Sequence, residues 1–226
     1  MQPRRGSGCE RAALCGGFDF LREYAVIRIT KLGEEILRER AEPVAEINDE
    51  IRSLAEEMFE AMIAANGVGL AGPQVGRKIR MFVVIADDDV RRVFINPQIV
   101  STSEELCDYE EGCLSIPQVW ESIRRPARVT VQAFNERGRP FTLEADGLLA
   151  RVIQHEYDHL EGILFIDRGD KEFAERTAAQ FQKRQAKAEQ KRREKEAKER
   201  SIAAKKAAAE AKKAARQESG RTPAAE

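Results

Sequence analysis

The chain has 226 residues, which is enough for one domain of ordinary size and an extension. Charged residues make up 34% of it and aromatic residues only 6%, a balance too polar for one compact globule of the full length. The net charge of −1 hides an asymmetry, because residues 171–226 hold 17 Lys and Arg against 9 Asp and Glu, leaving 21 against 30 in residues 1–170. We therefore expect an acidic body followed by a basic tail.

The cysteine spacing and the hydropathy exclude two classes of protein. The four cysteines, Cys9, Cys15, Cys107 and Cys113, are scattered and give no disulfide framework. No apolar run approaches the roughly 18 residues that cross a bilayer, and no apolar stretch follows the first arginines as a signal peptide would require. The sequence predicts a cytoplasmic protein with no membrane contact, in a compartment that keeps thiols reduced.

The first predicted elements come before the glycine-rich part of the chain. Residues 1–23 show no periodicity and predict an N-terminal extension, whereas residues 24–29 alternate weakly and predict a short strand. Apolar residues at steps of three and four predict a helix from Asn48 to Asn66. Asn48 is its expected N-cap, and Gly67 is expected to end it in the left-handed conformation.

The middle of the chain predicts an irregular loop and several strands. Residues 67–76 contain four glycines and a proline, which favours a loop. Residues 81–86 and 93–100 are apolar runs that predict strands, the second interrupted by a proline. Residues 128–134 and 140–145 predict a hairpin.

The last third of the chain predicts two helices. Apolar residues at helical spacing follow the expected cap Asp146 and end at Gly162, and residues 163–167 predict a short strand. After Gly169 the chain is rich in Ala, Lys, Glu and Arg with no Gly or Pro until Gly220, which predicts a long solvated helix without a coiled-coil seam. Short strands with two well-separated helices indicate an α+β fold.

The second helix carries the residues His155-Glu156-Tyr157-Asp158-His159, an H-E-x-x-H motif. Positions four apart lie on the same side of a helix, so both imidazoles can reach one ion. Glu156, next to the first ligand, can move protons to and from a metal-bound water. These are the only histidines in the chain and lie on the apolar side of the helix, so they indicate a metal site better than a chance surface pair does.

Two histidines do not complete a catalytic metal site, which usually has three protein ligands. The residues leave the third ligand open between a carboxylate (Glu161, Asp158 or Asp167) and a cysteine. Cys113 follows Gly112, which allows close approach of the backbone, and Pro117 is expected to break the strand after it. A thiolate suits zinc or ferrous iron, although a lone cysteine is more often a small buried apolar residue.

Three segments in order resemble peptide deformylase: GVGLAGPQ (67–74), EGCLSIP (111–117) and QHEYDHLEG (154–162). Residues 26–44 and 164–168 are also similar to that family, so the resemblance covers nearly all of a catalytic domain at residues 24–170. Together with the predicted elements, it implies short antiparallel strands packed around a central helix that carries H-E-x-x-H, with an N-terminal helix. The charged C-terminal helical tail is predicted from its composition and not from the resemblance.

The resemblance also implies an activity: metal-dependent hydrolysis of the N-formyl group from the N-terminal formyl-methionine of newly synthesised proteins, with release of formate. A metal-bound water would attack the formyl carbon, with Glu156 as general base and acid. Cys113, His155 and His159 would bind Fe²⁺, with Zn²⁺, Ni²⁺ or Co²⁺ as possible substitutes.

The resemblance assigns three further residues to substrate and oxyanion binding. Gln74 and the backbone N–H of Leu114 would donate to the developing oxyanion, and the backbone of Gly69 would hold the substrate. Such donors must be placed beforehand and are each worth about 3–4 kcal/mol in other oxyanion holes.

The sequence departs from the family pattern at two positions. Gly72 replaces an alanine of the family loop, which should loosen it slightly. Arg151 stands where the family usually has an apolar residue near the methionine pocket. Either its aliphatic stem lines the pocket with the charged head in water, or it narrows the specificity for methionine; Val68 and Leu148 are better candidates for the pocket lining. Glu111 is expected to pair with an arginine, either Arg124 or Arg125.

The tail of residues 171–226 has no counterpart in the short family pattern. It reads either as a solvated helical appendage or as a contact with ribosomal RNA phosphates. The body is expected to act on nascent formyl-methionyl peptides as a monomer. The alternatives are a metalloprotease built on H-E-x-x-H, which would need a further downstream ligand, and a non-catalytic ribosome-associated protein.

Overall fold

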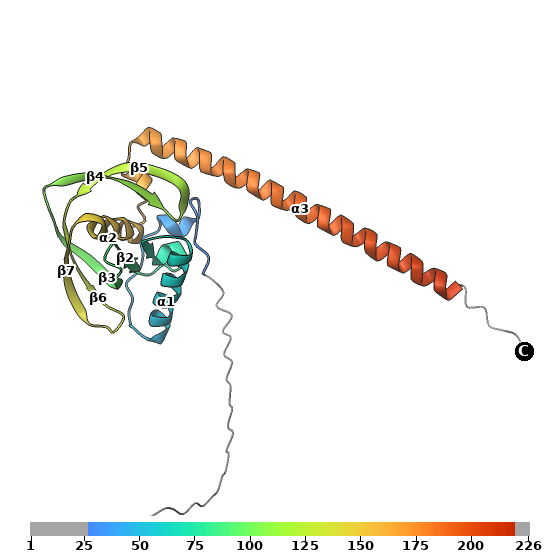
Figure 1. The fold of residues 1–226 in the computed structure, drawn as a ribbon, viewed down its shortest axis with the longest axis horizontal. Helices are drawn as coiled ribbons and strands as arrows, with labels where there is room; N and C mark the ends of the chain where they lie inside the picture. Colours follow the sequence, from blue (N-terminus) through green and yellow to red (C-terminus); the bar gives the residue numbers. More distant parts are fainter. Residues whose placement is uncertain (1–26, 220–226) are drawn as a thin grey trace, which may run out of the picture.

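The computed structural model describes residues 27–219, so the predicted extension of residues 1–23 lies outside the described part. The body consists of a five-stranded antiparallel sheet, a two-stranded hairpin and two helices, α1 (Asp49–Ala64) and α2 (Gly147–Leu160). A third helix, α3 (Lys171–Ser219), leaves the body (Figure 1). This arrangement confirms the predicted α+β fold and all three predicted helices.

The five-stranded sheet has the order β1-β2-β3-β6-β7. Its strands are β1 (Gly69–Ala71), β2 (Met81–Ile85), β3 (Arg91–Thr102), β6 (Val129–Phe134) and β7 (Pro140–Ala145). The two predicted strands and the predicted hairpin are confirmed. Strand β3 continues past Pro97, because its pairing with β6 shifts register between Ile95 and Gln98 and so accommodates a residue that lacks an N–H.

Strand β2 is buried on both faces, which explains its uninterrupted apolar run. Phe82 and Val84 belong to the core cluster that contains α2 residues, whereas Met81 and Val83 belong to the cluster that contains α1 residues. The sheet thus lies between the two helices and holds α2 from one side.

A separate hairpin packs near α2 and was not predicted. Strand β4 (Leu106–Cys113) pairs with β5 (Ile116–Pro126), leaving Leu114 and Ser115 as the turn (Figure 1). The expectation that Pro117 breaks the strand is wrong, because β5 includes it; both strands are edges of a two-stranded sheet, where a missing N–H is tolerated. The turn places Cys113 beside α2.

The helix ends differ in detail from the sequence prediction. The Asn48 side chain caps α1 by accepting from the Ile51 N–H at 3.1 Å, as predicted. The left-handed residue after α1 is Asn66 (φ 54°), not Gly67. Gly67 is required for a different reason, since a Cβ there would lie 2.7 Å from Leu114 Cδ1. Asp146 occupies the N-cap of α2 without a capping side-chain hydrogen bond.

Three local predictions are wrong. Residues 67–76 are not all irregular, because they form β1 and a 3-10 turn, η2 (Gly72–Val75). Residues 163–167 do not form a strand but contain the 3-10 turn η3 (Phe165–Asp167), and residues 27–29 lie in no strand. A further 3-10 turn, η1 (Glu35–Arg38), was not predicted. The conformation of these short segments depends on tertiary contacts rather than on local periodicity.

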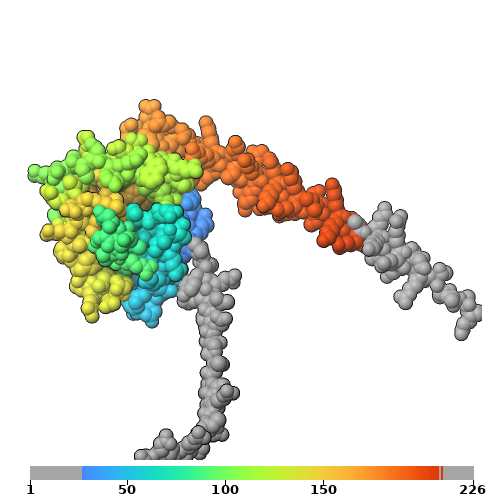
Figure 2. Space-filling view, in the orientation of Figure 1, coloured from blue at the N-terminus to red at the C-terminus, as the bar shows by residue number. Residues whose placement is uncertain are grey.

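Helix α3 has a packed beginning and an exposed remainder. Phe173 and Phe181 are buried in a third core cluster with Leu32, Cys113 and Phe165. Beyond Gln185 its side chains up to residue 208 are almost all exposed, and Figure 2 shows it in orange to red, projecting from the body. Within residues 27–219, no helix combines the length and apolarity that a bilayer crossing requires.

Candidate active site

Cys113, His155 and His159 converge, all three buried. One ligand atom from each lies within 4.8 Å of the others, and Cys113 Sγ is 3.2 Å from His159 Nε2. The thiol comes from the end of β4 and the two imidazoles from adjacent turns of α2. One thiolate and two imidazoles are a suitable donor set for a divalent transition metal.

The three carboxylates that had been alternative ligands are engaged elsewhere. Asp158 binds Arg125 at 2.6 Å and Arg168 at 2.5 Å. Glu161 binds Arg80 at 2.6 Å, and Asp167 binds Arg38. The geometry therefore favours Cys113 as the third ligand.

The protein holds His155 through its other ring nitrogen. His155 Nδ1 lies 2.9 Å from Glu111 Oε2, which leaves Nε2 for the metal. Glu111 also accepts from Arg125 Nε at 2.6 Å and from Arg151 Nη1 at 2.9 Å. Burial alone would raise the pKa of Glu111, but the hydrogen bonds from His155 and Arg125 hold it well below its usual range. Of the two expected partners, the structure selects Arg125, while Arg124 pairs with Asp108.

Electrostatics favour a thiolate in this cluster. Burial would raise the pKa of Cys113, but the charges of His159 and His155 and their hydrogen bonds bring it well below the usual value for a thiol. The thiolate is the form that binds metals. The residues present therefore fit a metal ion.

Glu156 lies at this cluster with one free oxygen. Its side chain is almost fully buried, and its Oε2 has no hydrogen-bond partner among the described residues. Burial raises the pKa of Glu156 to about 7, against the lowering effect of the two histidines. A carboxyl group that titrates near neutrality can both accept and return a proton.

Gly69 must be a glycine because the Glu156 carboxylate lies over it. A Cβ at residue 69 would collide with Glu156 Oε1 and would lie 2.7 Å from Val152 Cγ1. Strand β1 therefore runs directly beside Glu156.

Gln74 and Leu114 also lie beside the cluster. Gln74 Oε1 accepts from the Ala71 N–H at 2.8 Å, which turns Nε2 toward Cys113 Sγ at 3.4 Å and Ser115 Oγ at 3.3 Å. The Leu114 N–H, in the turn after Cys113, donates to no acceptor within residues 27–219. Two potential donors thus flank the thiolate.

Comparison with known proteins gives this constellation a family. The family model described as "Polypeptide deformylase" matches residues 26–174. The chain belongs to the peptide deformylase family. It is therefore a metal-dependent hydrolase that removes the formyl group from N-formyl-methionyl peptides, and the metalloprotease and non-catalytic alternatives are set aside.

Individual deformylases are similar over most of their length. The chain is 56% identical to peptide deformylase of Treponema pallidum (strain Nichols) over 140 residues, 62% of this chain and 86% of the relative. It is 50% identical to that of Acinetobacter baumannii (strain SDF), over 63% of this chain and 82% of the relative.

Solved deformylase structures share the fold. The Thermotoga maritima enzyme is 41% identical with a TM-score of 0.62, covering 64% of this chain and 98% of that one. The Synechococcus elongatus enzyme in complex with actinonin is 42% identical with a TM-score of 0.65, covering 68% and 85%.

Arg151 does not extend into open space beside the deformylase site. Its guanidinium is buried and donates to Glu111, to the Ile123 carbonyl at 2.8 Å and to the Cys107 carbonyl at 2.8 Å. It therefore ties α2 to both strands of the hairpin that carries Cys113. The long-range partners of an arginine have no sequence signal, which is why this role was missed.

Two exposed apolar side chains flank segments of the deformylase site. Val68 precedes β1 and is 44% exposed, and Trp120 on β5 is 63% exposed. A Cβ on Gly112 would lie 2.6 Å from Trp120 Cζ3, so this ring covers the backbone just before Cys113. Leu148, in the first turn of α2, is half-buried against the core. Lining of the methionine pocket by Val68 and Leu148 stays a prediction.

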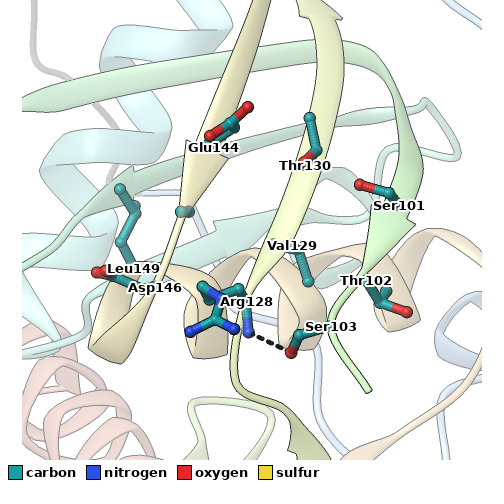
Figure 3. Close-up of a pocket in the computed structure, with 10 residues that line it drawn as sticks. Ser101, Thr102, Ser103, Arg128, Val129, Thr130, Glu144, Asp146 and Leu149 are labelled. Carbon is teal, nitrogen blue, oxygen red and sulfur yellow. Dashed lines mark hydrogen bonds between the residues drawn. The ribbon is translucent and has the colours of Figure 1, made fainter. Parts of the chain in front are cut away.

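A pocket of about 600 Å³ lies apart from this site, at the ends of β3 and β7 and the start of α2. Figure 3 shows its polar lining, in which the Arg128 N–H donates to Ser103 Oγ at 3.0 Å. None of the metal-binding or proton-transfer residues line it. The candidate site for deformylation is therefore the Cys113 cluster and not this pocket.

Proposed function

We propose that Cys113, His155 and His159 hold a single Fe²⁺ ion in this deformylase, and that Glu156 transfers protons during removal of the formyl group. The observation that carries the proposal is the convergence of one thiol and two imidazoles within 4.8 Å beside a buried carboxyl group. A thiolate ligand suits ferrous iron and also zinc, nickel or cobalt.

Cys113, His155 and His159 would hold the ion, which would supply Lewis acidity and make water nucleophilic near neutral pH. Glu156 would take one proton from the attacking water, whose oxygen bonds to the formyl carbon, and would give that proton to the methionine nitrogen as the C–N bond of the formamide breaks. Formate and a free amino terminus are the products. The raised pKa of Glu156, about 7, matches a group that must exist in both forms.

Gln74, Leu114 and Gly69 bind the reacting group and the peptide. Gln74 Nε2 and the Leu114 N–H donate to the formyl oxygen as negative charge develops on it. The backbone of Gly69 on β1 binds the peptide next to Glu156. The contact of Gln74 Nε2 with Cys113 Sγ at 3.4 Å, and the place of Leu114 directly after Cys113 in the turn, support these roles.

Substitution of Glu156 tests the proton-transfer role. In Glu156→Gln, formate release from a formyl-Met-Ala-Ser peptide should fall by roughly 10²–10⁴-fold, while metal content after anaerobic purification stays at about one iron per chain. Cys113→Ala should instead lose metal. Glu60→Gln, an exposed carboxylate of α1, is the control and should behave like the wild type. Undiminished turnover in Glu156→Gln would remove this residue from the mechanism.

The basic tail supports a second proposal, that α3 brings the enzyme to the ribosome. Six exposed lysines recur at steps of three, four or seven residues and so share one side of the helix: Lys183, Lys187, Lys191, Lys195, Lys198 and Lys205. Glu196 lies on the opposite side, whereas Glu194 and Glu199 lie three or four residues from lysines of the set, and Glu199 pairs with Lys195 at 3.8 Å. A stripe of positive charge on a projecting helix suits the phosphates of ribosomal RNA.

Co-sedimentation with ribosomes at low salt tests the tail. Changing the six lysines to glutamine should weaken binding at least about tenfold and flatten its salt dependence. Turnover of a short formyl-peptide should stay unchanged. The control changes Glu196, Glu199 and Glu210 to glutamine and should not weaken binding. Equal binding of the lysine variant and the wild type would end this proposal.

The monomeric state, the cytoplasmic location and the domain boundary at residue 170 remain predictions. The packing of Phe173 and Phe181 into the body bears on this boundary, because both residues follow residue 170. A truncation that spares the packed part of α3 should therefore end after Gln185.

A further inference from the structure

The segment Thr30–Leu32 joins the two turns that carry the proposed oxyanion donors. On one side, the Thr30 N–H donates to the Gln74 carbonyl at 2.8 Å, and Thr30 Oγ1 donates to the Pro73 carbonyl at 3.0 Å. On the other side, the Leu32 N–H donates to the Ser115 carbonyl at 3.0 Å. One short segment thus spans η2 and the β4–β5 turn.

Lys31, in the middle of this segment, makes a direct contact with the second turn. Its Nζ donates to the Leu114 carbonyl at 2.7 Å from a partly buried position. A hydrogen bond from a charged donor is about twice as strong as one between neutral groups. The contact is also long-range, 83 residues apart in sequence, so no local rule requires it.

We infer that Lys31 is a positioning residue for deformylation: by binding the Leu114 carbonyl it fixes the backbone of Leu114 relative to Gln74, so that the Leu114 N–H, in the preceding peptide group, and Gln74 meet the same formyl oxygen. This inference rests on the proposed roles of Leu114 and Gln74.

The β4–β5 turn needs such support. Leu114 and Ser115 lie outside both strands, and the pairing of β4 with β5 shifts register between Gly112 and Cys113. A hairpin of two strands has little rigidity of its own. An oxyanion donor acts only if it is held at about 2.7–3.1 Å from the developing charge, so movement of this turn costs rate rather than substrate affinity.

The tail helix reinforces the same segment from behind. Gln185 Nε2 donates to the Leu32 carbonyl at 3.1 Å, and Leu32 packs with Phe173 and Phe181. Thr30–Leu32 is therefore fixed on both sides, so that the backbone of Lys31 is held in place while its side chain binds Leu114.

Two variants of Lys31 test the inference. Lys31→Met keeps the aliphatic stem and removes the donor, and Lys31→Arg keeps a charged donor. Lys78→Met is the matched control, since among residues 27–219 the Lys78 ammonium pairs with Glu39 and Glu42 at the surface and with no group of the candidate site. Steady-state kinetics on formyl-Met-Ala-Ser, melting temperature and metal content are measured for each purified protein.

Lys31→Met should lower kcat by roughly tenfold and change KM by less than about twofold, because the interaction matters most in the transition state. Metal content and melting temperature should stay near those of the wild type. Lys31→Arg should recover most of kcat, and Lys78→Met should match the wild type.

An unchanged kcat in Lys31→Met, an effect on KM alone, or a Lys31→Arg variant as slow as Lys31→Met would overturn the inference. None of these results touches the proposed function, which fails separately if the wild type with bound metal releases no formate.

Discussion

Glu111 is the residue on which the geometry of His155 depends. Its two oxygens serve one imidazole and two guanidiniums, those of Arg125 and Arg151, and its side chain is only 3% exposed. Without it Arg151 would have no carboxylate partner among the described residues, and Arg125 would keep only Asp158. A buried charge that loses its counter-charge is far more costly than an exposed ion pair that is broken.

Glu111→Gln should therefore lower the free energy of unfolding at pH 7 by about 3–5 kcal/mol. Because the pKa of Glu111 is depressed in the folded protein, its contribution is present in full above the unfolded value of about 4.5 and is lost as pH falls below that. The difference between wild type and variant, measured by urea unfolding, should shrink below about pH 4.5.

The neighbouring carboxylate Asp108 offers a matched control for Glu111. It lies on the same strand and pairs with Arg124, but both side chains are more than half exposed. Asp108→Asn should cost less than about 1 kcal/mol. An equal loss in the two variants would show that burial of the Glu111 network does not govern its effect.

Site residues that lie on the same helix or strand can be predicted from the sequence. The two histidines were predicted because a helix brings positions i and i+4 together. Cys113 was predicted as a metal ligand only through the family resemblance, because no local sequence pattern shows that β4 lies beside α2. Lys31 and the contacts of Arg151 were missed for the same reason, since the direction of a long side chain depends on the tertiary fold.

Among the elements, α3 differs most along its length, with a packed first part and an exposed second part. Its first turns contribute Phe173 and Phe181 to the core cluster around Cys113 and Phe165, while later apolar residues such as Ile202 face solvent. The helical pattern of the sequence showed the length of α3 but not this division, because two aromatic residues among many charged ones form no visible stripe.

Phe181→Ala should destabilise the body by about 3–5 kcal/mol, at the low end because the site lies near the surface. Ile202→Ala on the same helix, where the side chain is 67% exposed, should change the unfolding free energy by less than about 0.5 kcal/mol. Urea unfolding monitored by the fluorescence of Trp120 measures both. Similar values for the two would mean that the start of α3 is not part of the core.

Strands and long helices were easier to predict than short turns. Runs such as 81–86 carry a strong apolar signal, whereas β1 and the 3-10 turns η1, η2 and η3 are too short for periodicity to distinguish. The β4–β5 hairpin was missed because its outer face is polar and its turn, Leu114–Ser115, contains no Gly or Asn.

For the whole molecule, the body and the exposed part of α3 should unfold separately. Residues 186–208 belong to no core cluster and are almost all exposed, and the helicity of an unsupported helix falls as the temperature rises. Far-UV circular dichroism should show a gradual loss of helix on heating before the cooperative transition of the body.

A chain that ends after Gln185 should lack this gradual phase and keep the cooperative transition within about 2 °C of the full chain. A single sharp transition in the full-length protein, shifted by the truncation, would contradict independent unfolding.

The helical form of the tail limits how far its end lies from the body. A helix rises about 1.5 Å per residue, so the 34 residues from 186 to 219 extend about 50 Å. A flexible tail of that length would let its tip wander through a wide range of separations from the metal ligands, whereas a helix keeps the separation nearly constant. A partner that bound the last turns of α3 would therefore be held at a nearly fixed distance from Cys113, His155 and His159.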